Sequence, residues 1–199
     1  MKLKRILFPF AICLSHFVFA QTAYRIEGQI KGLNGGSCIL ANYSAAQIYA
    51  KDTAQADNNG HFVFEGTKPL PGGIYEVVLP DRKTLFRVLV TDDQDFSFSA
   101  DTADVVGNMQ VKGSRDNELF YEFQRFMKSN EDEYQKLKAQ KVPEADKRYA
   151  AIQDQRKAFY DNFMKSNEGT FTVKLFKASA DPERPPAPKL PNGKTDSAW

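Results

Sequence analysis

The sequence is poor in the side chains that most often carry chemistry. It has two cysteines, two histidines and one tryptophan in 199 residues, and no Cys-x-x-Cys. Cys13 and His16 lie in an apolar N-terminal stretch, so Cys38 and His61 are what the rest of the chain offers. These numbers exclude a zinc site built from several histidines and an internal disulfide. We expect Cys38, in the strand-like stretch SCILANY, to be a small buried side chain rather than a reactive thiol.

Long hydrophobic runs are missing beyond the N-terminus. Residues 1–20, MKLKRILFPFAICLSHFVFA, have three basic residues and then an apolar stretch, which predicts a signal peptide cleaved after Ala20. The stretch is too short to span a membrane, so we expect a periplasmic or cell-envelope protein with no integral membrane span after signal removal. The large side chain of Ile12 before Cys13 disfavours lipoprotein processing. A retained anchor and a lipidated Cys13 stay open as alternatives.

A surplus of positive charge is also missing. The whole chain has a formal net charge of +2. Residues 1–20 hold three of the 27 basic residues and none of the 25 acidic ones, so the remainder carries a charge of about −1. Because phosphate binding needs a basic surplus on one face, we expect no nucleic-acid partner.

What the first half does contain is a β pattern. Short stretches of alternating or continuous apolar residues are separated by turn-forming segments such as KGLNGG, DNNG and LPGG. Their spacing of about ten residues predicts a mainly β fold, an antiparallel β-sandwich of about eight strands or a partly open barrel. The continuously apolar stretches 74–79 and 85–90 are placed near the centre of a sheet. The expected strands are 24–30, 38–43, 47–56, 61–65, 74–79, 85–90, 95–100 and 109–112.

After Gly113 the pattern becomes helical. An apolar stripe runs through NELFYEFQRFMKSNEDEYQKLK, with Ser114 or Asp116 available to cap its start. A second helix is expected from about Pro143 to about residue 167, and the short connection predicts an antiparallel helical hairpin. We expect this hairpin to pack on the sandwich or on itself. The stretch FTVKLFKASA is consistent with a short helix or a strand.

These patterns divide the chain into four parts. A signal peptide covers residues 1–20, a β-sandwich domain residues 21–113 and a helical hairpin region residues 114–180. Residues 181–199 hold five prolines and predict a semi-extended linker. A linker ordinarily joins two domains, so we expect the chain to be truncated before a further domain.

No catalytic, metal or cofactor site is predicted, and the ligand-binding residues are unknown. A calcium loop with Gly60 in the sixth position would need a carboxylate at Gln55 and at Gly66, and neither residue has one. The turn chemistry of Asn59-Gly60 instead predicts a β-hairpin with Phe62 and Phe64 on one face.

The other polar candidates give no stronger signal. His61 is expected to be a solvated residue at a strand end, and Asp92 and Asp93 to be solvated in a turn. Tyr43, Tyr49 and Tyr75 keep open a surface for stacking on sugars.

Five pieces of the sequence together carry a resemblance to a family. YRIEGQIKG, DTAQADNNGHFVFEG, PGGIYEVVLPD, VTDDQDFSFSAD and VKGSRDNELFYEF resemble, in order and spacing, an N-terminal domain of unknown function. That domain is found in exported thiol:disulfide interchange-like proteins of Gram-negative bacteria. The resemblance covers about residues 24–126, and the remainder looks like the helical segment that follows in some members.

The resemblance implies a β module that precedes a thioredoxin-like domain carrying the redox Cys-x-x-Cys. This chain has no such motif, so no catalytic residue is carried over. We therefore expect a noncatalytic accessory or interaction module of a periplasmic thioredoxin-like redox protein. Its partner would be a downstream thioredoxin-like domain, able to act as a thiol:disulfide oxidoreductase, or an envelope protein. The alternative is a glycan- or peptide-binding β-sandwich of the cell envelope, and an independent hydrolase is a third hypothesis.

Overall fold

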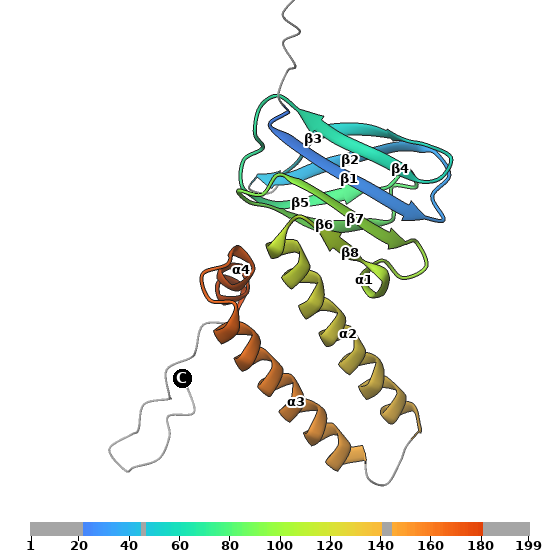
Figure 1. Ribbon diagram of the computed structural model, residues 1–199. Coiled ribbons are helices and arrows are strands. Elements are labelled where there is room, and N and C mark those ends of the chain that lie inside the picture. The colour runs from blue at the N-terminus through green and yellow to red at the C-terminus, as the bar shows by residue number, and fades with distance from the viewer. Residues whose placement is uncertain (1–21, 45–46, 141–144, 181–199) are drawn as a thin grey trace, which may run out of the picture.

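A computed structural model describes residues 22–44, 47–140 and 145–180 of the chain. The predicted signal peptide, Pro143 and the proline-rich segment 181–199 lie outside these residues. Two four-stranded sheets face each other, and helices extend away from one side of them (Figure 1). The prediction of a mainly β sandwich of about eight strands followed by helices is confirmed.

The strands divide equally between the two sheets. Sheet A has the order β4 (His61–Gly66), β1 (Tyr24–Lys31), β7 (Asp95–Asp101) and β8 (Gln110–Lys112). Sheet B has the order β3 (Gln47–Ala56), β2 (Gly36–Ser44), β5 (Gly73–Val78) and β6 (Leu85–Val90).

The expectation of a purely antiparallel sandwich is wrong at one pair. β1 and β7 run parallel, with Ile26 opposite Phe96, while the other pairs are antiparallel. Five strands separate β1 from β7 along the chain, so no short hairpin fixes their relative direction.

Side chains at every second position along the strands point inward and form the core between the two sheets. In β1, Tyr24, Ile26 and Ile30 are buried while their neighbours in sequence are partly or fully exposed. Aromatic rings join the sheets, since the ring centroids of Phe86 in β6 and Phe98 in β7 lie 5.3 Å apart. The predicted core faces of the strands are therefore confirmed.

The turn at residues 57–60 connects the sheets. Gly60 N donates to the Asp57 carbonyl at 3.0 Å, and Asp57 N donates to the His61 carbonyl at 2.9 Å. Gly60 has φ +81°, and a Cβ there would lie 2.1 Å from the Ile30 carbonyl oxygen, so only glycine fits. Asn59 does not share the positive φ. The segment is therefore a four-residue turn closed by the Gly60 amide, with a positive φ at its last residue.

The prediction of a simple hairpin at this turn is therefore wrong in two respects. Of Asn59 and Gly60, the two central residues of the predicted turn, only Gly60 has a positive φ, and the strands on either side do not remain paired. β3 pairs with β2 in sheet B, whereas β4 pairs with β1 in sheet A. The expected burial of Phe62 and Phe64 is confirmed, at 1% and 0% exposed.

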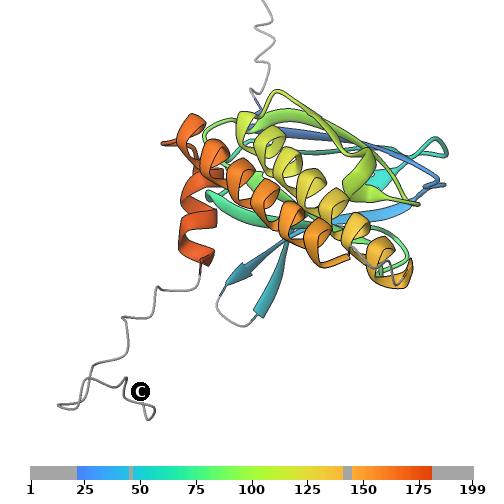
Figure 2. The ribbon, with the colours of Figure 1, turned by 90° about the horizontal axis from the view of Figure 1, so that it is seen from below.

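Four helices occur among the described residues. They are α1 (Val105–Asn108), α2 (Arg115–Gln140), α3 (Ala145–Ser166) and α4 (Phe171–Ser179). The segment FTVKLFKASA is thus helical, whereas α1 was not predicted. α2 and α3 form the expected antiparallel hairpin and lie side by side in both views (Figures 1 and 2). None of the described helices is long and apolar enough to cross a membrane.

The helical hairpin packs both on the sandwich and on itself. Phe120 and Tyr121, near the start of α2, belong to the main core. Further along, Phe126 of α2 stacks on Phe159 of α3 with ring centroids 3.7 Å apart. Ser114 caps α2, because its side chain accepts from Asn117 N and its carbonyl from Glu118 N.

The first turns of α2 seal the edge of sheet B. The fully buried Asn117 donates its side-chain amide to the Leu89 carbonyl and accepts from Leu89 N, both at 2.7 Å. The Tyr121 hydroxyl donates to the Arg87 carbonyl at 2.6 Å. β6 is therefore an edge strand covered by a helix, and its predicted central position in the sheet is wrong. Its continuous apolar sequence reflects burial against α2.

Candidate functional site

His61 lies on the outer face of sheet A beside an acidic partner. Its Nε2 is 2.8 Å from Oε1 of Glu27, which also pairs with Arg25. The hydrogen bond from Arg25, and then that with His61, hold the pKa of Glu27 below its usual value. The cross-strand register brings these residues together, since His61 of β4 is opposite Gln29 of β1 and Glu27 lies two residues away on the same face of the sheet. The arrangement is a half-exposed ion-pair cluster and brings no nucleophile to the histidine.

The acidic cluster at 57–60 is used within its own turn. Oδ1 of Asp57 accepts from Asn59 N at 2.8 Å and from His61 N at 2.9 Å. These two bonds, that from His61 first, lower the pKa of the Asp57 carboxyl. The described residues contain no group of three or more acidic, cysteine or histidine side chains placed to hold a metal ion.

Cys38 is completely buried in β2. Burial raises the pKa of its thiol to about 11, so the thiolate that redox chemistry needs is disfavoured. The sequence-based expectation of a small buried side chain is confirmed for its position.

The remaining candidates do not converge on one surface. Asp92 and Asp93 are exposed in the turn between β6 and β7. Tyr75 is fully buried and donates its hydroxyl to the Pro71 carbonyl at 2.8 Å, so the expectation that it contributes to a sugar-stacking surface is wrong. Tyr49 is 45% exposed in β3, opposite Asn42 of β2. The side chain of Tyr43 lies outside the described residues.

Two hollows adjoin each other beside α2. The first, of about 440 Å³, lies between β8 and the start of α2. Met109, Gln110 and Val111 line one wall, and Glu118 and Tyr121 line the other. Gly107 and Arg125 border both hollows, and we call the two adjoining hollows the trough. One wall of this trough is the free edge of sheet A.

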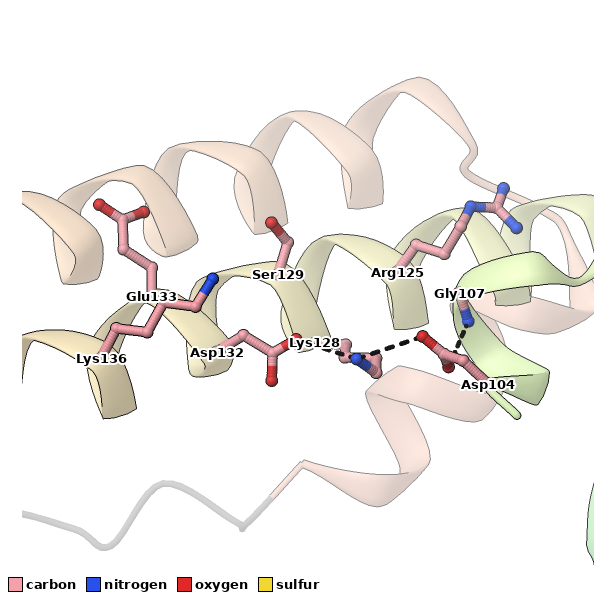
Figure 3. Close-up of a pocket in the computed structure, with 8 residues that line it drawn as sticks. All are labelled: Asp104, Gly107, Arg125, Lys128, Ser129, Asp132, Glu133 and Lys136. Carbon is pink, nitrogen blue, oxygen red and sulfur yellow. Dashed lines mark hydrogen bonds and ion pairs between the residues drawn. The ribbon is translucent and has the colours of Figure 1, made fainter. Parts of the chain in front are cut away.

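The second hollow, of about 540 Å³, continues along α2 beside α1. Its charged lining is balanced in sign, as Figure 3 shows: Arg125, Lys128 and Lys136 against Asp104, Asp132 and Glu133.

Two basic residues of α2 contact the α1–β8 segment. Nζ of Lys128 lies 2.9 Å from Asp132 and 3.4 Å from Asp104, which caps α1 by accepting from Gly107 N. Nη1 of Arg125 donates to the Met109 carbonyl at 2.7 Å.

Sequence reasoning missed this trough. Its α2 residues occupy the polar face of a predicted helix, which ordinarily indicates solvent exposure. α1 is a single four-residue turn and shows no periodicity of its own. The residues meet only because β8 leads directly into α2.

The fold and the trough define a two-sheet β-sandwich with a helical hairpin and an open groove at one sheet edge. Residues 24–120 match the family model described as "Domain of unknown function (DUF4369)". The match spans all eight strands and ends in α2 at Phe120, within the part of the helix that joins the sandwich core. No curated protein and no solved structure matches the chain.

Proposed function

We propose that this chain is a noncatalytic accessory or interaction module of a periplasmic thioredoxin-like redox protein, exported by a signal peptide. The observation that carries the proposal is the trough. Its mixed charges and the strand edge of β8 suit the binding of a polypeptide. The resemblance of five sequence pieces to the N-terminal domain of exported thiol:disulfide interchange-like proteins supports the redox setting.

The chemistry of Cys38 supports a role without catalysis. Its thiol is buried among core residues, and its raised pKa lowers the thiolate fraction at neutral pH. His61 is at the surface of the other sheet and engaged with Glu27, so the two reactive side-chain types occupy separate environments.

An insulin-reduction assay tests this proposal. The purified chain should reduce insulin disulfides no faster than its Cys38→Ala variant, with thioredoxin as the positive control. Cys38 should react with a thiol reagent only after unfolding. Reduction at a rate comparable with thioredoxin, lost in the variant, would contradict the noncatalytic assignment.

Export is tested separately. Expression in a Gram-negative host should yield a periplasmic product whose first residue is Gln21, as measured by mass spectrometry. A product retained in the cytoplasm with residues 1–20 attached would contradict the proposed address.

Of the alternative binding functions, the peptide version has more support than the glycan version. Tyr75 is removed from any sugar-stacking surface by its burial, whereas the edge of β8 offers main-chain groups to an incoming strand. Calorimetry with broad glycan and peptide sets separates the two, because peptide binding without glycan binding is expected.

A further inference from the structure

We propose that the free edge of β8, at Val111, and the trough beside it bind an extended segment of a partner polypeptide by strand addition. This inference deepens the proposed function and rests on it. It names the surface, the main-chain groups and the kind of partner.

The backbone of Met109 shows in which direction the main-chain groups of β8 point. This residue has extended backbone angles, φ −64° and ψ 123°, and its carbonyl points to Arg125 of α2. Main-chain groups of successive residues in a strand point to opposite edges. Gln110 and Lys112 therefore face β7, opposite Ser99 and Ser97. Val111 directs its N–H and C=O into the trough.

The two sheet edges on this side of the sandwich are treated differently. At β6, side chains of α2 bond to Leu89 N, the Leu89 carbonyl and the Arg87 carbonyl. At β8, the side-chain hydrogen bonds from α2 within the described residues reach only the Met109 carbonyl. One edge is sealed and the other is left open beside a hollow of about 440 Å³. An exposed strand edge is a template for pairing with another chain.

The charges of the trough indicate what occupies it. Side chains of both signs line it, and Lys128 already bridges Asp104 and Asp132. The cations are Arg125, Lys128 and Lys136, and the anions are Asp104, Glu118, Asp132 and Glu133. Such a lining disfavours polyanions and other ligands of one charge sign. It complements a polypeptide of mixed charge, whose main chain supplies the recognition at β8 and whose side chains meet α2.

The experiment uses the purified chain and an array of short peptides of alternating valine and threonine, flanked by aspartate, lysine or asparagine. Amide hydrogen exchange, resolved by NMR, is measured with and without the tightest-binding peptide. We expect exchange at the Val111 amide to slow by about tenfold or more on binding.

Variants at Val111 supply the second measurement. Val111→Pro removes the outward N–H, and proline is tolerated at an edge position whose N–H faces away from the sheet. It should retain the circular dichroism spectrum and weaken peptide binding by about tenfold, as for one lost hydrogen bond. Val111→Thr keeps the N–H and should bind within about twofold of the original chain.

Several results would overturn the inference. One is that no peptide of the array binds. Another is that the peptide slows amide exchange at the exposed β3 residues 48–51 and not at Val111. A third is that a folded Val111→Pro variant binds the peptide as tightly as the original chain. Protection of Val111 that rises with protein concentration without peptide would assign the edge to a second copy. None of these readouts depends on insulin reduction, so this inference and the noncatalytic assignment fail separately.

Discussion

The edges of β6 and β8 lie on the same side of the sandwich, one in each sheet, and the chain covers them unequally. Over β6, a fully buried asparagine and a tyrosine hydroxyl replace a neighbouring strand. Over β8, an arginine bonds to the Met109 carbonyl, and Lys128 forms a surface ion pair with Asp104 at the partly exposed rim of a trough. The comparison shows that side chains of α2 complete the hydrogen bonding at the edge of sheet B, whereas α2 mainly lies beside the edge of sheet A.

Removing the seal at β6 should give the largest effect. Asn117→Ala leaves Leu89 N and its carbonyl buried without partners, and we expect a loss of about 3 kcal/mol in the free energy of unfolding. Urea denaturation monitored by circular dichroism measures this loss.

Asn130→Ala is the matched control on the same helix. Asn130 is also buried, but its amide donates to the Phe126 carbonyl one turn before it. Its replacement should cost less than about 1 kcal/mol. Equal losses in the two variants would contradict a special role for Asn117.

The second contact at β6 should matter less. Tyr121→Phe removes one hydrogen bond to the Arg87 carbonyl and keeps the packed ring, so we expect a loss of about 1.5 kcal/mol. Tyr160→Phe, at a tyrosine that is 36% exposed, should change the stability by less than about 0.5 kcal/mol. The same denaturation experiment compares them.

The pH dependence of the free energy of unfolding provides a second test of the Tyr121 hydroxyl. Burial raises the pKa of Tyr121 above its ordinary value of about 10. The stabilisation from the neutral hydroxyl is therefore complete below about pH 10 and is lost as the pH rises towards the folded-state pKa. Between about pH 9 and pH 11, Tyr121→Phe should lose less stability than the original chain. Parallel curves for the two proteins would contradict burial of an un-ionised hydroxyl.

At β8 the effects should be smaller and local. Arg125→Ala removes the donor to the Met109 carbonyl at a half-exposed position, and we expect a global loss of about 0.5 kcal/mol. Amide exchange in the α1–β8 segment should accelerate, while exchange at Leu89 should not. A faster Leu89 amide would show that the two edges are not independent.

The smallest effect is expected at Lys128. Its ion pairs with Asp104 and Asp132 are at the surface, where screening by water and salt makes such pairs weak. Lys128→Ala should leave the melting temperature unchanged within error, at low and at high salt. A clear fall in melting temperature would make these ion pairs part of the structural support of β8.

Local patterns predicted most of the strands because alternation of apolar residues depends only on neighbours in the chain. They also predicted α2, α3 and the capping role of Ser114. They could not assign Asp116, whose carboxylate accepts from Thr172 N, 56 residues away. Nor could they predict that Asn117 would bond to Leu89, since an asparagine at a helix start ordinarily indicates a cap. The trough joins one short turn, one edge strand and one polar helix face. The strand and the helix were predicted, but neither pattern indicates that they form a site together.

The sequence by itself determined the strands, the apolar stripes of the helices, a turn at Gly60 and the small number of reactive side chains. Each follows from backbone geometry, side-chain periodicity or composition, all of which act over short distances along the chain. Only the tertiary structure decided that β1 and β7 are parallel, that the turn at 57–60 joins two sheets, and that one edge is sealed while the other is open. These features depend on contacts between segments that are distant in the sequence. The free energy of such contacts cannot be inferred from a local sequence pattern.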